Sequence, residues 1–404
     1  MIRSLNTGIS GLRSHQTRMD VVSNNIANIN TIAFKRSRVA FGEVLGQQLL
    51  GVGRSAGGTG INPSFVGQGV AVGSIDQNWG QGALETTNVL TDLALNGSGF
   101  FVARGIDRNV LTRAGNFTFN NDGELVTANS GLKVQAFAYT SDGEVDTSQL
   151  SDIQLNFNAQ APPKFTEGID IGGNLSADAA VGDEVSFSKV IYDEQGTAHA
   201  VVVRFTKAAD NAWDYTIQNE DTVFADASGQ VTFNTDGTLN SPTNLSVNWD
   251  TNFVTGGDAI TIDFQELTQY ASSSTANIRG QDGFASGKFA SFTINPEGII
   301  LMNYTNGQQE AVYQLALADV DNPNGLEQLG ENFYGTSGSS GDSVVGRAGR
   351  ELSTTVVAGA LEMSNVDLAA EFTNMIITQR GYQASARVIT TSDEILQETV
   401  QLKR

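Results

Sequence analysis

The sequence predicts a multidomain protein with a nested insertion topology, in which long α-helical termini form a coiled coil and the rest of the chain forms mainly antiparallel β-domains of the sandwich or barrel type. Apolar residues recur with heptad spacing at both ends of the 404-residue chain. Between them apolar and polar residues alternate with a period of two, as in half-buried strands. Turn dipeptides such as Asp122-Gly123 and Asn306-Gly307 separate these runs without intervening helical patterns, which favours antiparallel sheets.

The N-terminal helix is predicted from apolar residues that recur at steps of three and four between residues 2 and 26. No proline interrupts this stretch. Its predicted seam consists of Ile2, Leu5, Ile9, Leu12, Met19 and Ile26.

The C-terminal helix is predicted from the same spacing, continued over residues 368–400. Ser364, Asn365 and Asp367 precede it and supply capping chemistry. Its predicted seam consists of Leu368, Phe372, Met375, Tyr382, Ala386, Ile389, Leu396 and Val400.

The two seams predict self-association. Burying each seam residue contributes about 2 kcal/mol, whereas ordering each residue of the helices costs about 1.5 kcal/mol. A lone pair of helices is therefore marginal, and we expect neighbouring copies to complete its packing. A helical hairpin docked on its own β-domain is the alternative.

Period-two alternation in the middle of the chain predicts strands, as at Trp213, Tyr215 and Ile217 and again at Ile260, Ile262 and Phe264. We expect three domains from these changes of pattern. They are a helical assembly domain (1–70 with 355–404), an inner β domain (71–144 with 284–354) and an inserted outer β domain (145–283).

The charge balance excludes several classes of partner. With 23 Lys and Arg against 44 Asp and Glu, the net charge is −21, which disfavours nucleic acids and anionic membrane surfaces. Residues 1–40 are the basic exception, with six basic residues and one acidic residue. The absence of cysteine excludes disulfides and thiolate metal sites. We therefore expect no nucleic-acid partner and no membrane insertion.

Motifs for catalysis or cofactor binding are not found in the sequence. The run Asp319–Gly325 begins like a calcium loop, but Pro323 occupies a ligand position and Gly330 replaces the twelfth-position acid. Only two histidines are present. We expect no enzymatic activity, no cofactor and no metal.

Residues 23–35 read SNNIANINTIAFK, which resembles the signature of the bacterial flagellar axial proteins of the rod and hook class. Ala33 stands where that signature has glycine. Residues 92–103, 111–138, 282–308 and 361–397 resemble further blocks of this family. The matching signature residues are Ser23, Asn24, Asn25, Ala27, Asn28, Asn30, Thr31, Phe34 and Lys35.

The resemblance implies a structural subunit that assembles helically into a hollow curved tube outside the cell, acting as a universal joint between motor and filament. It implies uncleaved export through the flagellar type III apparatus. It also implies contacts with the distal rod, the hook cap and the hook–filament junction protein. The large insert favours a hook member, with distal-rod and junction proteins as alternatives. A secreted adhesin-like β-rich module and a carbohydrate-active enzyme are alternatives of other classes.

Several signature residues have two interpretations. Asn24, Asn25 and Asn28 either bond between subunits or end the first helix. The basic run Lys35, Arg36 and Arg38 either meets acidic residues of neighbouring copies or is solvated.

Overall fold

The computed structural model describes residues 2–50, 53–54, 60–61, 64–140, 143–219, 222–248 and 259–401. The chain forms two compact units. The first comprises Met1–Leu155, Thr293–Leu301 and Ala311–Arg404, and the second comprises Asn156–Phe292 and Met302–Glu310. The domain boundaries expected from the sequence, near residues 145 and 283, stay a prediction.

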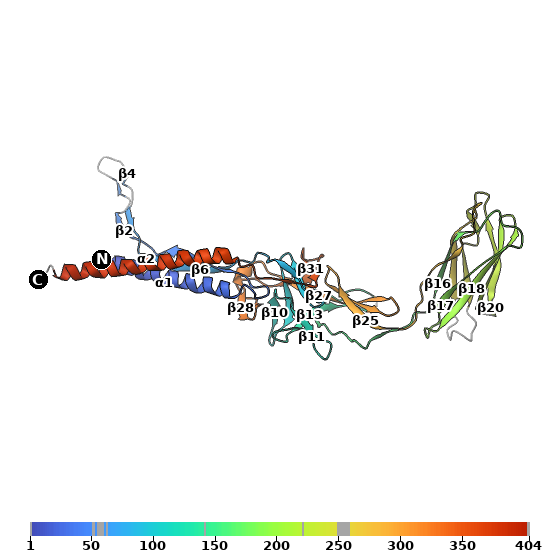
Figure 1. The fold of residues 1–404 in the computed structure, drawn as a ribbon, viewed down its shortest axis with the longest axis horizontal. Coiled ribbons are helices and arrows are strands. Elements are labelled where there is room, and N and C mark those ends of the chain that lie inside the picture. The colour runs from blue at the N-terminus through green and yellow to red at the C-terminus, as the bar shows by residue number, and fades with distance from the viewer. Residues whose placement is uncertain are drawn as a thin grey trace. The chain divides into compact units, whose positions relative to one another are not determined.

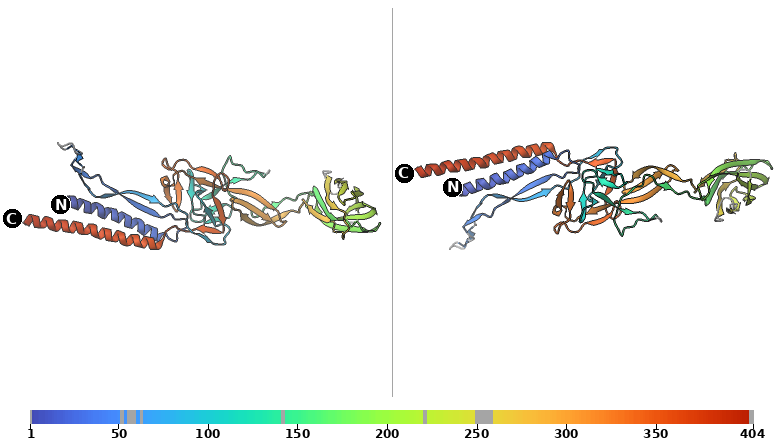
Figure 2. Two further views of the ribbon diagram at one scale, coloured as in Figure 1. Left: turned by 90° about the horizontal axis from the view of Figure 1, so that it is seen from above. Right: turned by 90° about the horizontal axis from the view of Figure 1, so that it is seen from below.

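Two long helices form one end of the first unit. Helix α1 (Ile2–Ala27) and helix α2 (Leu368–Gln401) run antiparallel, side by side, in all views (Figures 1 and 2). The Asp367 carboxylate begins α2, since its Oδ1 accepts hydrogen bonds from the backbone N–H groups of Ala369 (2.9 Å) and Ala370 (3.2 Å). The predicted cap at Asp367 is confirmed.

A long β-hairpin follows α1 along the chain and packs against it. Strands β1 (Ser37–Glu43) and β6 (Val70–Gln77) pair antiparallel. The Ser14 hydroxyl of α1 donates to the Val70 carbonyl (3.5 Å). The hairpin continues outward through β2 (Gln47–Leu50) with β5 (Ser64–Val66) and β3 (Gly53–Arg54) with β4 (Gly60–Ile61).

The β body of the first unit joins strands from both halves of the sequence. Strand β7 pairs with β32, and β8 pairs with β31. Its elements are β7 (Leu84–Thr86), β8 (Leu93–Asn96), β9 (Phe100–Arg104), β10 (Asn109–Thr112), β11 (Phe117–Phe119), β12 (Leu125–Thr127), β13 (Lys133–Ala138), β14 (Ser151–Asp152), β26 (Ile299–Tyr304), β27 (Gln309–Asp319), η1 (Pro323–Gly325), β28 (Glu327–Gly330), β29 (Phe333–Gly335), β30 (Val344–Arg347), β31 (Thr355–Ala358) and β32 (Ala360–Glu362). Strands from the early and the late part of the chain therefore pair in this body.

The second unit contains two sheets with a common core. One has the order β17-β18-β19-β20-β21, and the other β22-β23-β16-β24. Trp213 and Phe205 from the first sheet pack with Phe264 from the second. The strands of these two sheets are β16 (Gly168–Asn174), β17 (Glu184–Tyr192), β18 (Ala198–Ala209), β19 (Ala212–Asn219), β20 (Thr222–Phe233), β21 (Leu239–Ser241), β22 (Asn244–Asn248), β23 (Ala259–Thr268) and β24 (Asn277–Gln281). Strands β15 (Gln160–Ala161) and β25 (Gly287–Ile294) pair with each other outside the two sheets.

The alternation predicted from the sequence is confirmed in this unit. Trp213, Tyr215 and Ile217 are buried in β19, and Ile260 and Phe264 are buried in β23. The pairing is mostly antiparallel, but β16 and β23 pair in parallel. This pair departs from the expected pattern because its strands are far apart in sequence, so no tight turn fixes their direction.

Candidate functional site

The signature segment forms the turn that leads from α1 into β1. Asn25 is buried, and its side chain donates to the Ser37 carbonyl (2.8 Å) and accepts from the Ser37 N–H (3.0 Å). Asn28 Nδ2 donates to the Asn24 carbonyl (2.9 Å), and Thr31 Oγ1 donates to Asn28 Oδ1 (3.0 Å). These asparagines therefore bond within their own chain and close the end of the helix.

Other signature residues differ in their exposure. Ser23, Ala27 and Asn30 are exposed, and Phe34 is half-buried. Ala33 is fully buried with a φ of 56°, and its N–H donates to the Glu362 carbonyl (2.8 Å). This left-handed conformation favours glycine, which explains why the signature has glycine here.

A buried ion cluster lies directly after this turn and consists of Lys35, Arg113 and Glu362. Lys35 Nζ lies 2.7 Å from Glu362 Oε1, and Arg113 Nε lies 2.8 Å from Glu362 Oε2. The side chains of Lys35 and Glu362 are 1% and 0% exposed. Glu362 Oε1 also accepts the N–H of Gly82 (2.8 Å), and Lys35 Nζ donates to the Gly80 carbonyl (2.9 Å). The cluster ties the segment after α1 to the strand before α2.

The pKa values within the ion cluster reflect burial and charge together. Burial alone would raise the pKa of Glu362, but the charges of Arg113 and Lys35 and their hydrogen bonds outweigh it and hold this pKa below 4.5. Burial lowers the pKa of Lys35, although Glu362 opposes this shift. In this cluster, two basic side chains share one carboxylate.

A second polar contact joins the start of β1 to the start of α2. Arg36 Nε lies 3.2 Å from Glu371 Oε1, and Asn25 Nδ2 donates to Glu371 Oε2 (3.4 Å). Arg38, which is exposed, lies 3.6 Å from Asp76 on β6. The basic run thus meets acidic residues of its own chain. Neither sequence interpretation anticipated this, because the acidic partners are remote in sequence or on the opposite hairpin strand.

At three positions of the contact between α1 and α2, one of the two helices carries a glycine. A Cβ atom on Gly8 would lie 3.0 Å from Ile389 Cγ1, and one on Gly11 would lie 2.9 Å from Ser385 Oγ. A Cβ on Gly381 would lie 2.5 Å from the His15 ring. Glycine allows this close approach of the two backbones.

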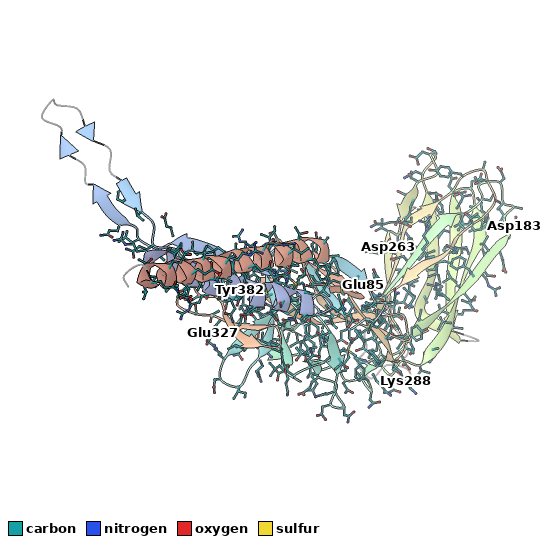
Figure 3. The ribbon with its side chains drawn as sticks, turned by 60° about the vertical axis from the view of Figure 1, so that its left-hand side comes forward. Glu85, Asp183, Asp263, Lys288, Glu327 and Tyr382 are labelled. Carbon is teal, nitrogen blue, oxygen red and sulfur yellow. The ribbon has the colours of Figure 1, made fainter. Side chains whose placement is uncertain are left out.

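Apart from Ile389, which lies over Gly8, the predicted seam residues border this contact instead of filling its centre. Ile9, Leu368, Phe372 and Val400 are exposed, with Phe372 at 51% and Val400 at 71%. Half-buried seam residues are Leu5, Leu12, Met19, Ile26, Met375, Tyr382, Ala386, Ile389 and Leu396. The side chain of Ile2 lies outside the described residues. Figure 3 labels Tyr382 on α2.

Helical geometry places both seams on one side of the helix pair. At about 100° per residue, the seam of α1 lies about 90° from the line through Gly8 and Gly11. The seam of α2 lies about 80° from the line through Ser385 and Ser392, in the same rotational sense. In an antiparallel pair, both seams then share a side. Ser14, which contacts the hairpin, lies on the other side of α1. We call the shared surface, formed by the seam residues named above, the seam face.

Sequence reasoning did not identify Arg113 or Glu362. Glu362 lies 327 residues from Lys35 and 249 from Arg113, so no local pattern connects them. The close contact between the two helices could have been predicted from Gly8 and Gly11, since two glycines inside a helical pattern indicate close packing.

Within the described residues, no three His, Asp or Glu side chains gather as a potential metal site. Over the same part of the chain, no helix has the length and apolar character needed to span a membrane.

Four family models match the chain and define a flagellar axial protein. They are "Flagella basal body rod protein" (residues 5–35), "Flagellar hook protein FlgE/F/G D1 domain" (94–175), "Flagellar basal body protein FlaE D2 domain" (176–284) and "Flagellar basal body rod FlgEFG protein C-terminal" (357–402).

Full-length relatives narrow this class. The flagellar hook protein FlgE of Treponema pallidum (strain Nichols) is 35% identical, with 100% of both chains covered. The FlgE of Salmonella typhimurium (strain LT2) is 32% identical, covering 99% of this chain and 100% of the relative. The solved Helicobacter pylori flagellar hook protein FlgE2 shares the fold, with a TM-score of 0.52 and 14% identity over 69% of this chain and 100% of that chain. The chain belongs to the flagellar hook protein FlgE family and is a structural subunit of the bacterial flagellar hook.

Proposed function

We propose that copies of this chain assemble helically into a hollow curved tube, a universal joint that transmits motor torque to the filament. The helix pair forms the inner coiled-coil layer, and the seam face is its main contact with other copies. The β-domains lie outside this layer, with the boundaries expected from the sequence.

The observation that carries the proposal is the exposure of the seam face. Phe372, Leu368, Ile9 and Val400 are exposed apolar side chains on helices that already pack against each other. Full burial of a side chain of this kind contributes about 1.5–3 kcal/mol. A contiguous exposed apolar surface on a structural subunit favours a protein–protein contact.

Family membership supports the rest of the proposal. The chain functions without enzymatic activity, cofactor, nucleic acid or membrane insertion. It contacts the distal rod, the hook cap and the hook–filament junction protein after uncleaved export by the type III apparatus. The tube lies outside the cell.

The purified full-length chain tests this proposal in a sedimentation assay combined with electron microscopy. We expect the wild type to form hollow tubes of uniform diameter above a critical concentration. Phe372→Glu should raise that concentration at least about 30-fold, because losing about 2 kcal/mol per contact corresponds to that factor. Gln383→Glu, at an exposed polar position of α2, is the matched control and should assemble like the wild type.

Circular dichroism must show equal helicity in the three proteins. Compact closed particles from the wild type would instead support an adhesin-like module. Unchanged assembly of Phe372→Glu would exclude the seam face from the contact.

A further inference from the structure

Helix α2 carries a second apolar stripe that the seam does not include. The second stripe consists of Ile377, Ala384, Val388 and Ile395. Ile377, Val388 and Ile395 are 53%, 42% and 52% exposed. At about 100° per residue these four positions lie within about 20° of one line along the helix. They also follow a 7-4-7 spacing, which is typical of a packed helix face.

The second stripe and the seam face lie on opposite flanks of the contact with α1. The α2 residues that face α1, such as Ser385 and Ser392, lie about 60–80° from the second stripe. The seam of α2 lies about as far on the other flank. Val388 reaches only the edge of α1, where its Cγ1 would lie 3.5 Å from a Cβ on Gly8. Helix α1 therefore cannot cover both stripes of α2.

Helical polymers need two different surfaces for each repeated contact. A contact between like surfaces closes into a dimer, whereas a contact between unlike surfaces continues indefinitely. On the helix pair, the seam face and the second stripe are two unlike apolar surfaces. The charges of the helices also complement each other, because α1 carries three arginines and one aspartate, whereas α2 carries four acidic and two basic residues.

We propose that the second stripe of one copy docks against the seam face of another copy of this chain. Each helix pair then joins two neighbours, one through each surface. The inference rests on the proposed assembly and adds which surfaces meet. It also explains why glycines lie in the contact between α1 and α2, since they leave most of the large apolar side chains free for neighbouring copies.

Seeded growth tests the pairing of unlike surfaces. Sheared wild-type tubes are incubated with wild-type subunits and a trace of a variant, and tube length is measured by electron microscopy. Ile395→Glu alters the second stripe, Phe372→Glu alters the seam face, and Gln383→Glu is the control. Val388→Glu is a second variant of the stripe, and circular dichroism verifies that each variant keeps its helices.

A subunit that joins a tube end uses one surface and offers the other to the next subunit. We therefore expect the stripe and seam-face variants to behave differently. One should join the end and stop growth at far less than one variant per wild-type subunit. The other should stay in the supernatant without affecting growth. Alone, Phe372→Glu should require the about 30-fold higher concentration expected above, and each stripe variant at least a tenfold higher concentration than the control.

Two results would overturn the inference while leaving the proposed function intact. Stripe variants that elongate tubes like the control would show that the second stripe is not used. Equal behaviour of the stripe and seam-face variants would show that each surface meets its like. Failure of the wild type to form tubes would reject the proposed assembly itself, and the inference with it.

Discussion

Replacing Glu362 by glutamine removes the only carboxylate of the buried ion cluster while preserving the volume of the side chain. Lys35 Nζ and Arg113 Nε lie 2.7 and 2.8 Å from the two Glu362 oxygens, so both cations lose their counter-charge in one step. The two cations contact different oxygens of Glu362, and glutamine replaces one of these oxygens by an NH₂ group, so one cation would face a donor instead of an acceptor.

The expected cost follows from burial. Removing one member of a buried ion pair typically costs 3–5 kcal/mol, because an uncompensated charge remains in a poorly solvated site. Both cations of the cluster are almost fully buried, which places Glu362→Gln at about 4 kcal/mol. With a denaturant slope of about 3 kcal/mol/M, the urea midpoint of the first unit should fall by about 1.3 M.

Urea unfolding followed by hydrogen-exchange mass spectrometry separates the two units. Peptides from β9 report on the first unit, and peptides from β18 in the second unit serve as an internal reference. The matched control is Glu351→Gln, which removes the more exposed ion pair with Arg347 and should cost no more than about 1 kcal/mol. Equal midpoints for the two variants would refute the reasoning, as would a shift confined to β18.

Further predictions concern the same unit. Arg113 and Lys35 hold the pKa of Glu362 below 4.5, so the wild type should lose stability as the pH falls from about 4.5 through the folded-state pKa. Glu362→Gln has no carboxylate to protonate at this position and should not show this loss. The difference between the unfolding free energies of the two proteins should therefore shrink in acid titrations. Ala33→Gly should change the unfolding free energy by less than about 1 kcal/mol, because relief of the positive φ offsets the lost buried methyl group. Ala33→Val should cost more than about 2 kcal/mol in the same urea assay, because a β-branched residue adds volume and strain. Gly8→Leu should force Ile389 and α2 away from α1, which hydrogen exchange would detect as lost protection in both helices with β9 unchanged.

Local patterns predicted the elements well. Heptad spacing indicated both helices, and Asp367 was identified as a cap, because these signals depend on neighbours within one or two turns. Alternation around Trp213 predicted a half-buried strand for the same reason.

Long-range relations could not be read in this way. Heptad spacing shows that Met375 and Tyr382 share a face, but it does not say which partner that face meets. The partner of this face depends on Gly8 and Gly11, because these glycines bring the backbones of α1 and α2 together and leave most of the seam at the border of the contact. The ion pair between Lys35 and Glu362 depends on the tertiary fold. The sequence indicated only one of its two members, Lys35, through the family signature.

The location of Glu362 has a consequence for chains of incomplete length. This residue follows almost nine-tenths of the sequence, yet it neutralises two cations that precede it by hundreds of positions. A truncated polypeptide ending before it would keep Lys35 and Arg113 without compensation, and β7 would lack its partner β32. We expect such fragments to remain unfolded around these positions, which limited proteolysis would reveal. The buried ion cluster and the β7–β32 pair therefore form only when both terminal segments of the chain are present, so incomplete chains do not fold stably next to the helices.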